Sequence, residues 1–258
     1  MLDNIAGKHI WIIGCSSGIG RALAKELSEQ GAILALSARN QKALVALNDE
    51  LGGAHQVLPF DVSNYKDLDR IANELSIKWP RIDSVIHLAA SYDPDNKHQV
   101  VPEQVKQSIE VNLTSAFMLT HSMVPLLKKQ DNGGQLVFCG SVAGYRGLPT
   151  GQPYCATKSA IINMAESFRV DYAPDNIDVK VICPGFVRTP LTDKNDFKMP
   201  MMIEPEEAAK HIRKGLTRKA FEIHFPKKFT YLVKFLRIMP NAMFFWLIKK
   251  VMTSSKSK

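Results

Sequence analysis

The stretch Ile13-Gly14-Cys15-Ser16-Ser17-Gly18-Ile19-Gly20 carries most of the information about the fold of this chain of 258 residues. It joins an apolar run, residues 9–13, to a segment with helical spacing, residues 19–30. Glycines permit a tight turn here and let the backbone approach a pyrophosphate, while the start of the helix offers amide donors. A glycine turn can also simply end a strand, but the order of strand, turn and helix favours a dinucleotide-binding loop.

Short apolar runs alternate with segments of helical spacing along the rest of the chain. Seven runs are predicted as strands: residues 9–13, 33–36, 56–60, 84–88, 135–139, 178–183 and 222–225. Six segments are predicted as helices: residues 19–30, 41–51, 65–78, 105–128, 153–172 and 205–216. This alternation is typical of an α/β fold, and strands that are apolar throughout are typical of a parallel sheet. We therefore expect one doubly wound parallel sheet with helices on both faces.

The composition excludes several classes of protein. With 45% hydrophobic and 22% charged residues, the chain has enough apolar material for a sizeable core and is not disordered as a whole. The four cysteines, Cys15, Cys139, Cys155 and Cys183, form no C-x-x-C pair, so we expect reduced thiols and no metal site. The polar N-terminus and the lack of a long apolar stretch predict a cytoplasmic protein.

The end of the second predicted strand indicates which dinucleotide is bound. In an NAD(H) site an acidic residue usually binds the ribose hydroxyls at this point. The run Ser37-Ala38-Arg39-Asn40 instead places a guanidinium there, which suits the additional phosphate of NADP(H). The alternative is that Arg39 is an exposed arginine without a ligand. Asp61 and Val62 follow the third strand and are expected to meet the adenine, although Asp61 could also cap a turn.

Four residues point to acid–base chemistry. Tyr154 and Lys158 lie four residues apart, so a helix places them on one face. A nearby ammonium is expected to lower the pKa of the phenol and make it usable as a general acid or base. Ser141, at the end of the fifth strand, can donate a hydrogen bond to a substrate oxygen. Asn112 lies inside a predicted helix, where an amide calls for a hydrogen-bonding explanation. Each residue alone has a structural explanation, but together they favour catalysis.

Residues 5–225 resemble the short-chain dehydrogenase/reductase family. The resemblance rests on Gly14-x-x-x-Gly18-Ile19-Gly20, Asp61-Val62, Asn112, Ser141-Val142-Ala143-Gly144, Tyr154-x-x-x-Lys158 and Pro184-Gly185-Phe186-Val187-Arg188-Thr189. It implies a Rossmann domain of seven parallel strands. It also implies that Tyr154 is the acid/base, that Lys158 holds the nicotinamide ribose, that Ser141 polarises the carbonyl and that Asn112 holds a water of the proton relay. The residues expected to bind the cofactor are Gly14, Ser16, Ser17, Gly18, Ile19, Gly20, Arg39, Asp61, Val62, Ala89, Tyr154, Lys158, Pro184, Gly185, Val187 and Thr189.

Two positions depart from the family pattern. The usual Thr before the first glycine is Ile13, which is expected to cost a hydrogen bond that braces the loop. The usual Asn-Asn-Ala-Gly run after the fourth strand is His87-Leu88-Ala89-Ala90, which removes two amides and adds a methyl group near the cofactor. We expect His87 to be a histidine of the core or the strand end rather than a catalyst.

The C-terminal end differs from the rest in charge. Residues 206–258 carry 13 Lys and Arg against three acidic residues. We expect a Rossmann domain over residues 1–226 and an extension over residues 227–258, whose two short helices are divided at Pro240-Asn241. Apolar residues recur there at helical spacing between basic residues: Phe229, Leu232, Val233, Leu236, Phe244, Leu247, Ile248 and Val251. Such helices bind an anionic membrane surface, or they cover a substrate pocket or a subunit interface.

These observations predict a reductase or dehydrogenase that transfers a hydride between NADP(H) and a carbonyl or secondary alcohol of a hydrophobic small molecule. One alternative is a 3-oxoacyl thioester reductase, whose acidic carrier protein would bind Lys210, Arg213 and Lys214. Another is a non-catalytic dinucleotide-binding sensor or scaffold. A nucleic-acid partner is disfavoured because the basic residues alternate with aliphatic ones and no binding motif is present. The family resemblance also implies a homodimer or homotetramer.

Overall fold

The computed structural model describes residues 2–94, 100–197 and 199–256, with side chains up to residue 250. Its centre is one sheet of seven parallel strands in the order β3-β2-β1-β4-β5-β6-β7. The strands are β1 (His9–Ile13), β2 (Ile33–Ser37), β3 (Gln56–Val57), β4 (Ser84–His87), β5 (Gly134–Cys139), β6 (Ile177–Pro184) and β7 (Glu222–Phe225). The predicted α/β fold with a doubly wound parallel sheet is therefore confirmed.

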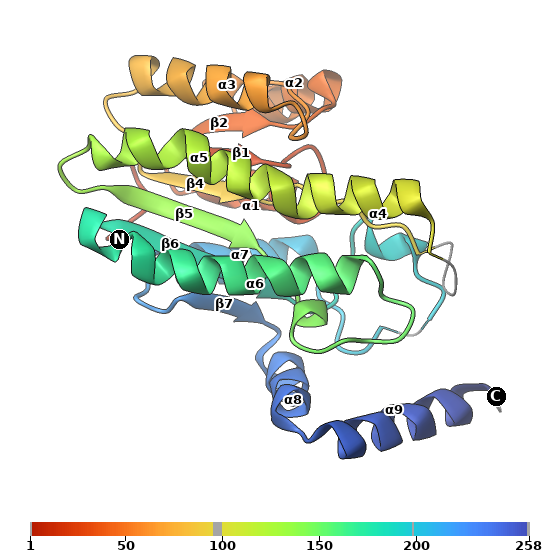
Figure 1. Ribbon diagram of the computed structural model, residues 1–258. Coiled ribbons are helices and arrows are strands. Elements are labelled where there is room, and N and C mark those ends of the chain that lie inside the picture. The colour runs from red at the N-terminus through yellow and green to blue at the C-terminus, as the bar shows by residue number, and fades with distance from the viewer. Residues whose placement is uncertain (1, 95–99, 198, 257–258) are drawn as a thin grey trace.

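Helices cover both faces of the sheet (Figure 1). One face carries α3 (Tyr65–Lys78), α5 (Ser115–Lys128) and α6 (Tyr154–Asp171), and the other carries α1 (Gly18–Glu29), α2 (Gln41–Glu50) and α7 (Pro205–Leu216). Side chains alternate along each strand, so that Trp11 and Ile13 enter the first core while Ile10 and Ile12 enter the second. The central strands are buried on both faces for this reason.

The chain reverses its direction of travel across the sheet between β1 and β4. Strands β2 and β3 are added on one side of β1, and β4 to β7 are added on the other. At such a point the loops that leave neighbouring strands separate and open a crevice at the carboxyl ends of the strands. The loops after β1 and β4 therefore mark the expected ligand site.

Two elements differ from their predicted extents by more than one residue at an end. Strand β3 has two residues instead of five, although Leu58 and Phe60 still donate to β2 and the residue after it. The helix predicted over residues 105–128 is three elements: α4 (Pro102–Ile109), a π-helical turn η1 (Glu110–Thr114) and α5.

The extension after β7 is helical, as predicted. Helix α8 (Lys227–Ile238) and helix α9 (Asn241–Lys256) are separated at Met239 and Pro240. The predicted apolar stripe of α8 is divided, because Phe229 and Val233 pack against the core while Leu232 is 55% exposed. Among the described residues, no helix is long and apolar enough to cross a bilayer.

Candidate active site

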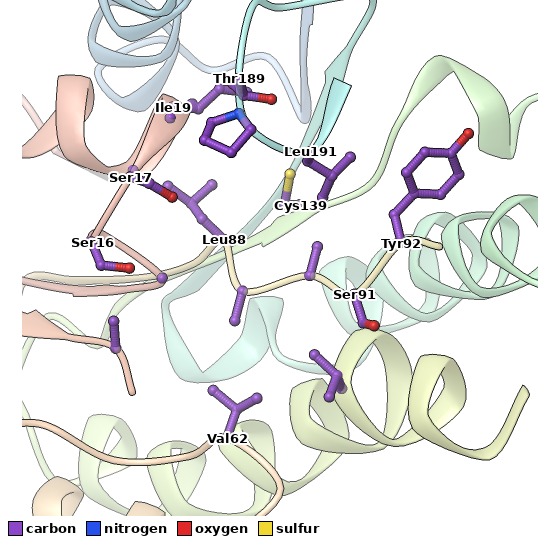
Figure 2. Close-up of a pocket in the computed structure, with 18 of the residues that line it drawn as sticks. Ser16, Ser17, Ile19, Val62, Leu88, Ser91, Tyr92, Cys139, Thr189 and Leu191 are labelled. Carbon is purple, nitrogen blue, oxygen red and sulfur yellow. The ribbon is translucent and has the colours of Figure 1, made fainter. Parts of the chain in front are cut away.

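A cavity of about 890 Å³ opens at the carboxyl ends of the strands, between the loops that follow β1 and β4. All sixteen residues that were predicted to bind the cofactor line it, and so do Ser141, Tyr154 and Lys158. Figure 2 shows Ser16 and Ser17 from the loop after β1 on one side of this cavity and Ser91 and Tyr92 from the loop after β4 on the other. The sequence motifs therefore converge on a single site.

The glycine loop is shaped for close approach of a ligand. Gly14 has a φ of +94°, and a Cβ there would lie 2.6 Å from the backbone nitrogen of Ala89. A Cβ on Gly20 would lie 2.1 Å from the carbonyl oxygen of Gly14. Only glycine fits at both positions. The amides of Gly14 and Cys15 donate to the carbonyl of Ser37 at 2.7 and 3.3 Å, so the loop has backbone bracing although Ile13 offers none from its side chain.

Arg39 and Asp61 lie at the rim of the cavity. The Arg39 side chain is 73% exposed, and its Nη1 lies 3.9 Å from Oδ2 of Asp61. Asp61 accepts hydrogen bonds from the backbone and the hydroxyl of Ser63 at 2.9 and 2.6 Å. Burial alone would raise the pKa of Asp61, but these bonds and the Arg39 charge hold it below its usual value. Asp61 is thus a turn residue as well as a lining residue, and Arg39 remains accessible to an anion.

Ser141, Tyr154 and Lys158 meet where β5 ends and α6 begins. Ser141 directly precedes a short 3₁₀ turn, η2 (Val142–Gly144), whose Ala143 amide donates to the Ser141 hydroxyl at 3.1 Å. Tyr154 is the first residue of α6, and Lys158 follows one turn later with only 1% of its surface exposed. The Lys158 Nζ donates to the carbonyl of Cys139 at 2.8 Å and lies 5.4 Å from the centre of the Tyr154 ring.

The expected lowering of the Tyr154 pKa is wrong for the protein by itself. Burial raises the pKa of Tyr154 well above its usual value, the Cys139 thiol contributes in the same direction, and a hydrogen bond with Ser141 opposes both. Burial also lowers the pKa of Lys158. The physical reason is that neither the phenolate nor the ammonium is well solvated in this pocket. Tyr154 therefore carries its proton at neutral pH.

Asn112 does not line the cavity but joins three segments beneath it. Its Oδ1 accepts from the amide of Ser91 at 2.6 Å, and its Nδ2 lies 2.9 Å from the carbonyl of the same residue. The Nδ2 also lies 3.2 Å from the hydroxyls of Ser108 and of Thr157, which is on α6 between Tyr154 and Lys158. Asn112 itself lies on the π-helical turn η1, and such turns are often found at functional sites.

His87 is a strand-end histidine, as predicted. It is 3% exposed, and its Nε2 lies 2.9 Å from the hydroxyl of Ser115. That hydroxyl itself donates to the carbonyl of Val111 at 2.7 Å, so the His87 Nε2 carries a hydrogen and donates. Burial lowers the pKa of His87 to about 4, and the Lys158 charge acts in the same direction. His87 is therefore neutral near pH 7.

A contact between the loop after β4 and the loop around residues 193–202, which was expected to cover the pocket, was not predicted from the sequence. Tyr92 packs edge-on against the Tyr154 ring with centroids 5.0 Å apart, and its hydroxyl donates to Oδ1 of Asn195 at 2.7 Å. Lys194, in the 3₁₀ turn η4 (Thr192–Lys194), donates to the Tyr92 carbonyl at 3.1 Å. Leu191 and the thiol of Cys139 also face the cavity (Figure 2). No periodicity or motif links residues 92 and 195, so this contact could not be predicted from the sequence.

Comparison with known proteins gives consistent matches. The family model described as short chain dehydrogenase matches residues 8–199. An uncharacterised oxidoreductase of Myxococcus xanthus is 32% identical over 90% of this chain and 93% of its own length. A 3β-hydroxysteroid dehydrogenase of Mediterraneibacter gnavus is 32% identical over 73% of this chain and 69% of its own. A short chain dehydrogenase of Burkholderia cenocepacia, solved in complex with NADP, has a similar fold, with a TM-score of 0.81 at 23% identity over 93% of this chain and 97% of that one.

Proposed function

Because this chain belongs to the short chain dehydrogenase family of oxidoreductases, we propose that it transfers a hydride between NADP(H) and the carbonyl or secondary alcohol of a lipophilic small molecule. The observation that carries the proposal is the meeting of Ser141, Tyr154 and Lys158 on the wall of a cavity that also contains the glycine loop. A non-catalytic sensor would have no need of this acid–base set.

The residues present fit a dinucleotide. A side chain at Gly14 would collide with the backbone of Ala89, and one at Gly20 would collide with the backbone of the glycine loop itself. Glycines therefore keep the backbone open to the close approach of a pyrophosphate. At the far end of the same wall Arg39 suits the 2′-phosphate of NADP(H), because its guanidinium is accessible and no carboxylate follows the second strand. When bound, the dinucleotide supplies the hydride that the protein side chains cannot.

In the reduction direction, charge develops on the substrate oxygen. Ser141 donates a hydrogen bond to that oxygen, and Tyr154 donates the proton. The raised pKa of Tyr154 keeps the phenol protonated, which is the form a general acid needs. Lys158, which is held by the Cys139 carbonyl, offers its remaining N–H groups to the ribose. Its ammonium also stabilises the Tyr154 phenolate that forms once the proton has been donated. Asn112 bonds to Thr157 on α6 and to Ser91 in the loop after β4, and so positions both of these segments at the site.

Substitution of Tyr154 by Phe tests the assignment. We expect Tyr154→Phe to lower kcat by about 10²- to 10⁴-fold, because it removes the transferable proton, while the Kd for NADPH stays close to that of the wild type. Turnover is followed by NADPH oxidation and binding by NADPH fluorescence. Tyr172→Phe, at the other end of α6, is the matched control and should behave as wild type. Near-normal turnover in Tyr154→Phe would contradict the mechanism.

Substitution of Arg39 by Asp tests the choice of dinucleotide. We expect Arg39→Asp to lower the preference for NADPH over NADH by about tenfold or more, since a charge-assisted hydrogen bond is replaced by repulsion. The measurement is kcat/KM with each cofactor. Lys42→Asp, a charge change at the exposed second residue of α2 and outside the cavity lining, is the control. A wild type that already prefers NADH would overturn this part of the proposal.

Several features support a lipophilic substrate. Leu191, Val187 and Val111 contribute apolar surface to the cavity, and one relative carries the name of a steroid dehydrogenase. NADPH oxidation with carbonyl compounds of graded chain length should show kcat/KM rising with length.

The thioester alternative is weaker, because Arg213 is engaged with Glu26 at 2.5 Å, which leaves Lys210 and Lys214 for a carrier protein. The four free cysteines support the cytoplasm as the compartment, and a homodimer or homotetramer remains the expected assembly.

A further inference from the structure

Helices α8 and α9 expose an unusual amount of apolar surface. The exposed residues, which we call the α8–α9 face, are Tyr231, Leu232, Phe235, Ile238, Met243, Phe245 and Trp246, each between 55% and 77% exposed. On α8 they recur three and four residues apart, on the side opposite to buried Val233. Figure 1 shows that both helices stand out from the body of the protein below β7. Isolated apolar residues are common on surfaces, but a face of this extent marks an interaction site.

The charge of this region indicates the kind of partner. Residues 223–258 contain no Asp or Glu, whereas α8 and the first part of α9 carry Lys227, Lys228, Lys234, Arg237, Lys249 and Lys250. Lys234 is neutralised by Glu222, but the balance remains strongly positive. A second copy of this chain is a poor occupant, because a twofold contact through this face would bring cations against cations. A partner with an apolar interior and an anionic surface would complement both the exposed apolar side chains and the positive charge of this region.

The two helices are held in a fixed elbow. The Arg146 guanidinium donates to the carbonyl of Arg237 at 3.1 Å and to the side chain of Asn241, and it lies 4.5 Å above the ring centre of Phe244. These contacts join the end of α8 to the start of α9. Helix α8 is in turn joined to the sheet, because its Lys234 bonds to Glu222 on β7. The α8–α9 face is therefore formed by two helices that the Arg146 contacts join to each other.

The elbow adjoins the loop that lines the cavity. The Phe229 ring of α8 lies 5.5 Å from the Phe186 ring, and a Cβ on Gly185 would lie 2.8 Å from Phe229. Phe186 in turn lies 5.9 Å from Phe197, which is 48% exposed. Gly185 is a lining residue of the cavity. These ring contacts thus connect the inner side of α8 to the segment that contains the lining residue Gly185.

We propose that the α8–α9 face docks on the surface of an anionic lipid bilayer, and that a lipophilic substrate passes from the bilayer to the cavity beside Phe186 and Phe197. The aromatic and aliphatic side chains enter the boundary between head groups and acyl chains, and the lysines contact the head groups, as in other interfacial helices. Docking stands independently of the activity, whereas the delivery of substrate rests on the proposed function.

Co-sedimentation of the full-length protein with vesicles tests docking without substrate or cofactor. We expect binding to vesicles of phosphatidylcholine mixed with phosphatidylglycerol, weaker binding to phosphatidylcholine alone, and weakening by salt. Trp11 and Trp79 are buried and Trp246 is 64% exposed, so the blue shift of fluorescence on binding reports the face itself. The double variant Phe235→Ser/Trp246→Ser should lose affinity by about tenfold or more.

The control carries the same kind of change elsewhere. Ile77→Ser/Val170→Ser replaces two exposed apolar residues on α3 and α6, 84% and 73% exposed, and should bind as wild type. Equal loss in both double variants, or no binding of the wild type to anionic vesicles, would overturn docking. A wild-type dimer that the Phe235→Ser/Trp246→Ser change dissociates, without vesicle binding, would assign the face to a second copy instead.

Delivery is tested by comparing two substrates. Phe235→Ser/Trp246→Ser should retain the wild-type kcat/KM for a short, water-soluble ketone and lose it for a long-chain ketone embedded in anionic vesicles. Equal rates with the embedded ketone would overturn delivery but leave docking intact. Failure of the wild type on both ketones would count against the proposed function, not against the vesicle result.

Discussion

His87 departs from the family pattern, yet its side chain still makes a buried structural hydrogen bond. The histidine lies at the end of β4 and bonds through Nε2 to Ser115, so it ties the strand to α5 without a charge. The residue sits near Lys158, whose charge also disfavours the imidazolium. Holding a buried histidine neutral makes folding sensitive to acid.

We expect the free energy of unfolding to fall as the pH is lowered through this range. The pKa of His87 is about 4 in the folded protein, against about 6.5 in the unfolded chain, so below pH 6.5 only the unfolded chain binds the proton. This single site lowers the free energy of unfolding by about 3 kcal/mol when the pH reaches 4. His224, whose pKa burial and the nearby lysine charges lower to about 4, adds in the same direction.

Urea unfolding from about pH 7.5 to about pH 4.5 checks this, since His87→Asn should flatten the pH dependence of the free energy of unfolding. His121→Asn, at an exposed position on α5, is the control and should keep the wild-type slope. An unchanged slope in His87→Asn would show that other groups govern the acid sensitivity.

The elements were largely predictable from the sequence, and the exceptions have physical causes. Apolar runs and helical spacing predicted every strand and the α/β order, because burial of these faces sets both patterns. The π-helical turn at η1 was not predictable, since one extra residue per turn leaves the apolar spacing on both sides intact. Glycines, Tyr154 and Lys158 were identified because short-range geometry fixes their role. Tyr92 was missed because its contact with Asn195 depends on the packing of two irregular loops.

The contact between these loops is expected to affect substrate binding. Loss of the hydrogen bond in Tyr92→Phe should loosen residues 190–197 and raise KM for the carbonyl substrate by about threefold to tenfold, with little change in the Kd for NADPH. Asn195→Ala should have the same effect. The double variant should be no worse than either single one, because both remove the same bond. Additive effects would show that the two residues act separately.

At the scale of the whole chain, the boundary expected at residue 226 separates the Rossmann domain from an extension that begins with α8. Helix α8 places Val233 and Phe229 against the core and bonds to β7 through Lys234, whereas α9 is tied chiefly through Arg146 and Phe244. The two helices should therefore contribute unequally to stability, although they form one exposed face.

Truncation at two points measures this difference. Ending the chain after Pro240 should lower Tm by about 2–4 °C, since it removes roughly one tertiary contact cluster. Ending it after Pro226 should lower Tm by about 10 °C or more, because buried side chains of α8 are lost as well. Differential scanning calorimetry of the three lengths gives the comparison. An unchanged Tm after removal of residues 227–258 would show that the extension folds independently of the domain.

The strand order has a consequence for self-association. One border of the sheet is β3, with two residues, and the other is β7, with four residues and α8 beside it. Neither border offers a long row of unsatisfied backbone groups, which is what edge-to-edge polymerisation requires. Copies of this chain should consequently meet through helices, where Phe117 on α5 and Val170 on α6 are exposed, and a sheet continuous between two copies is disfavoured.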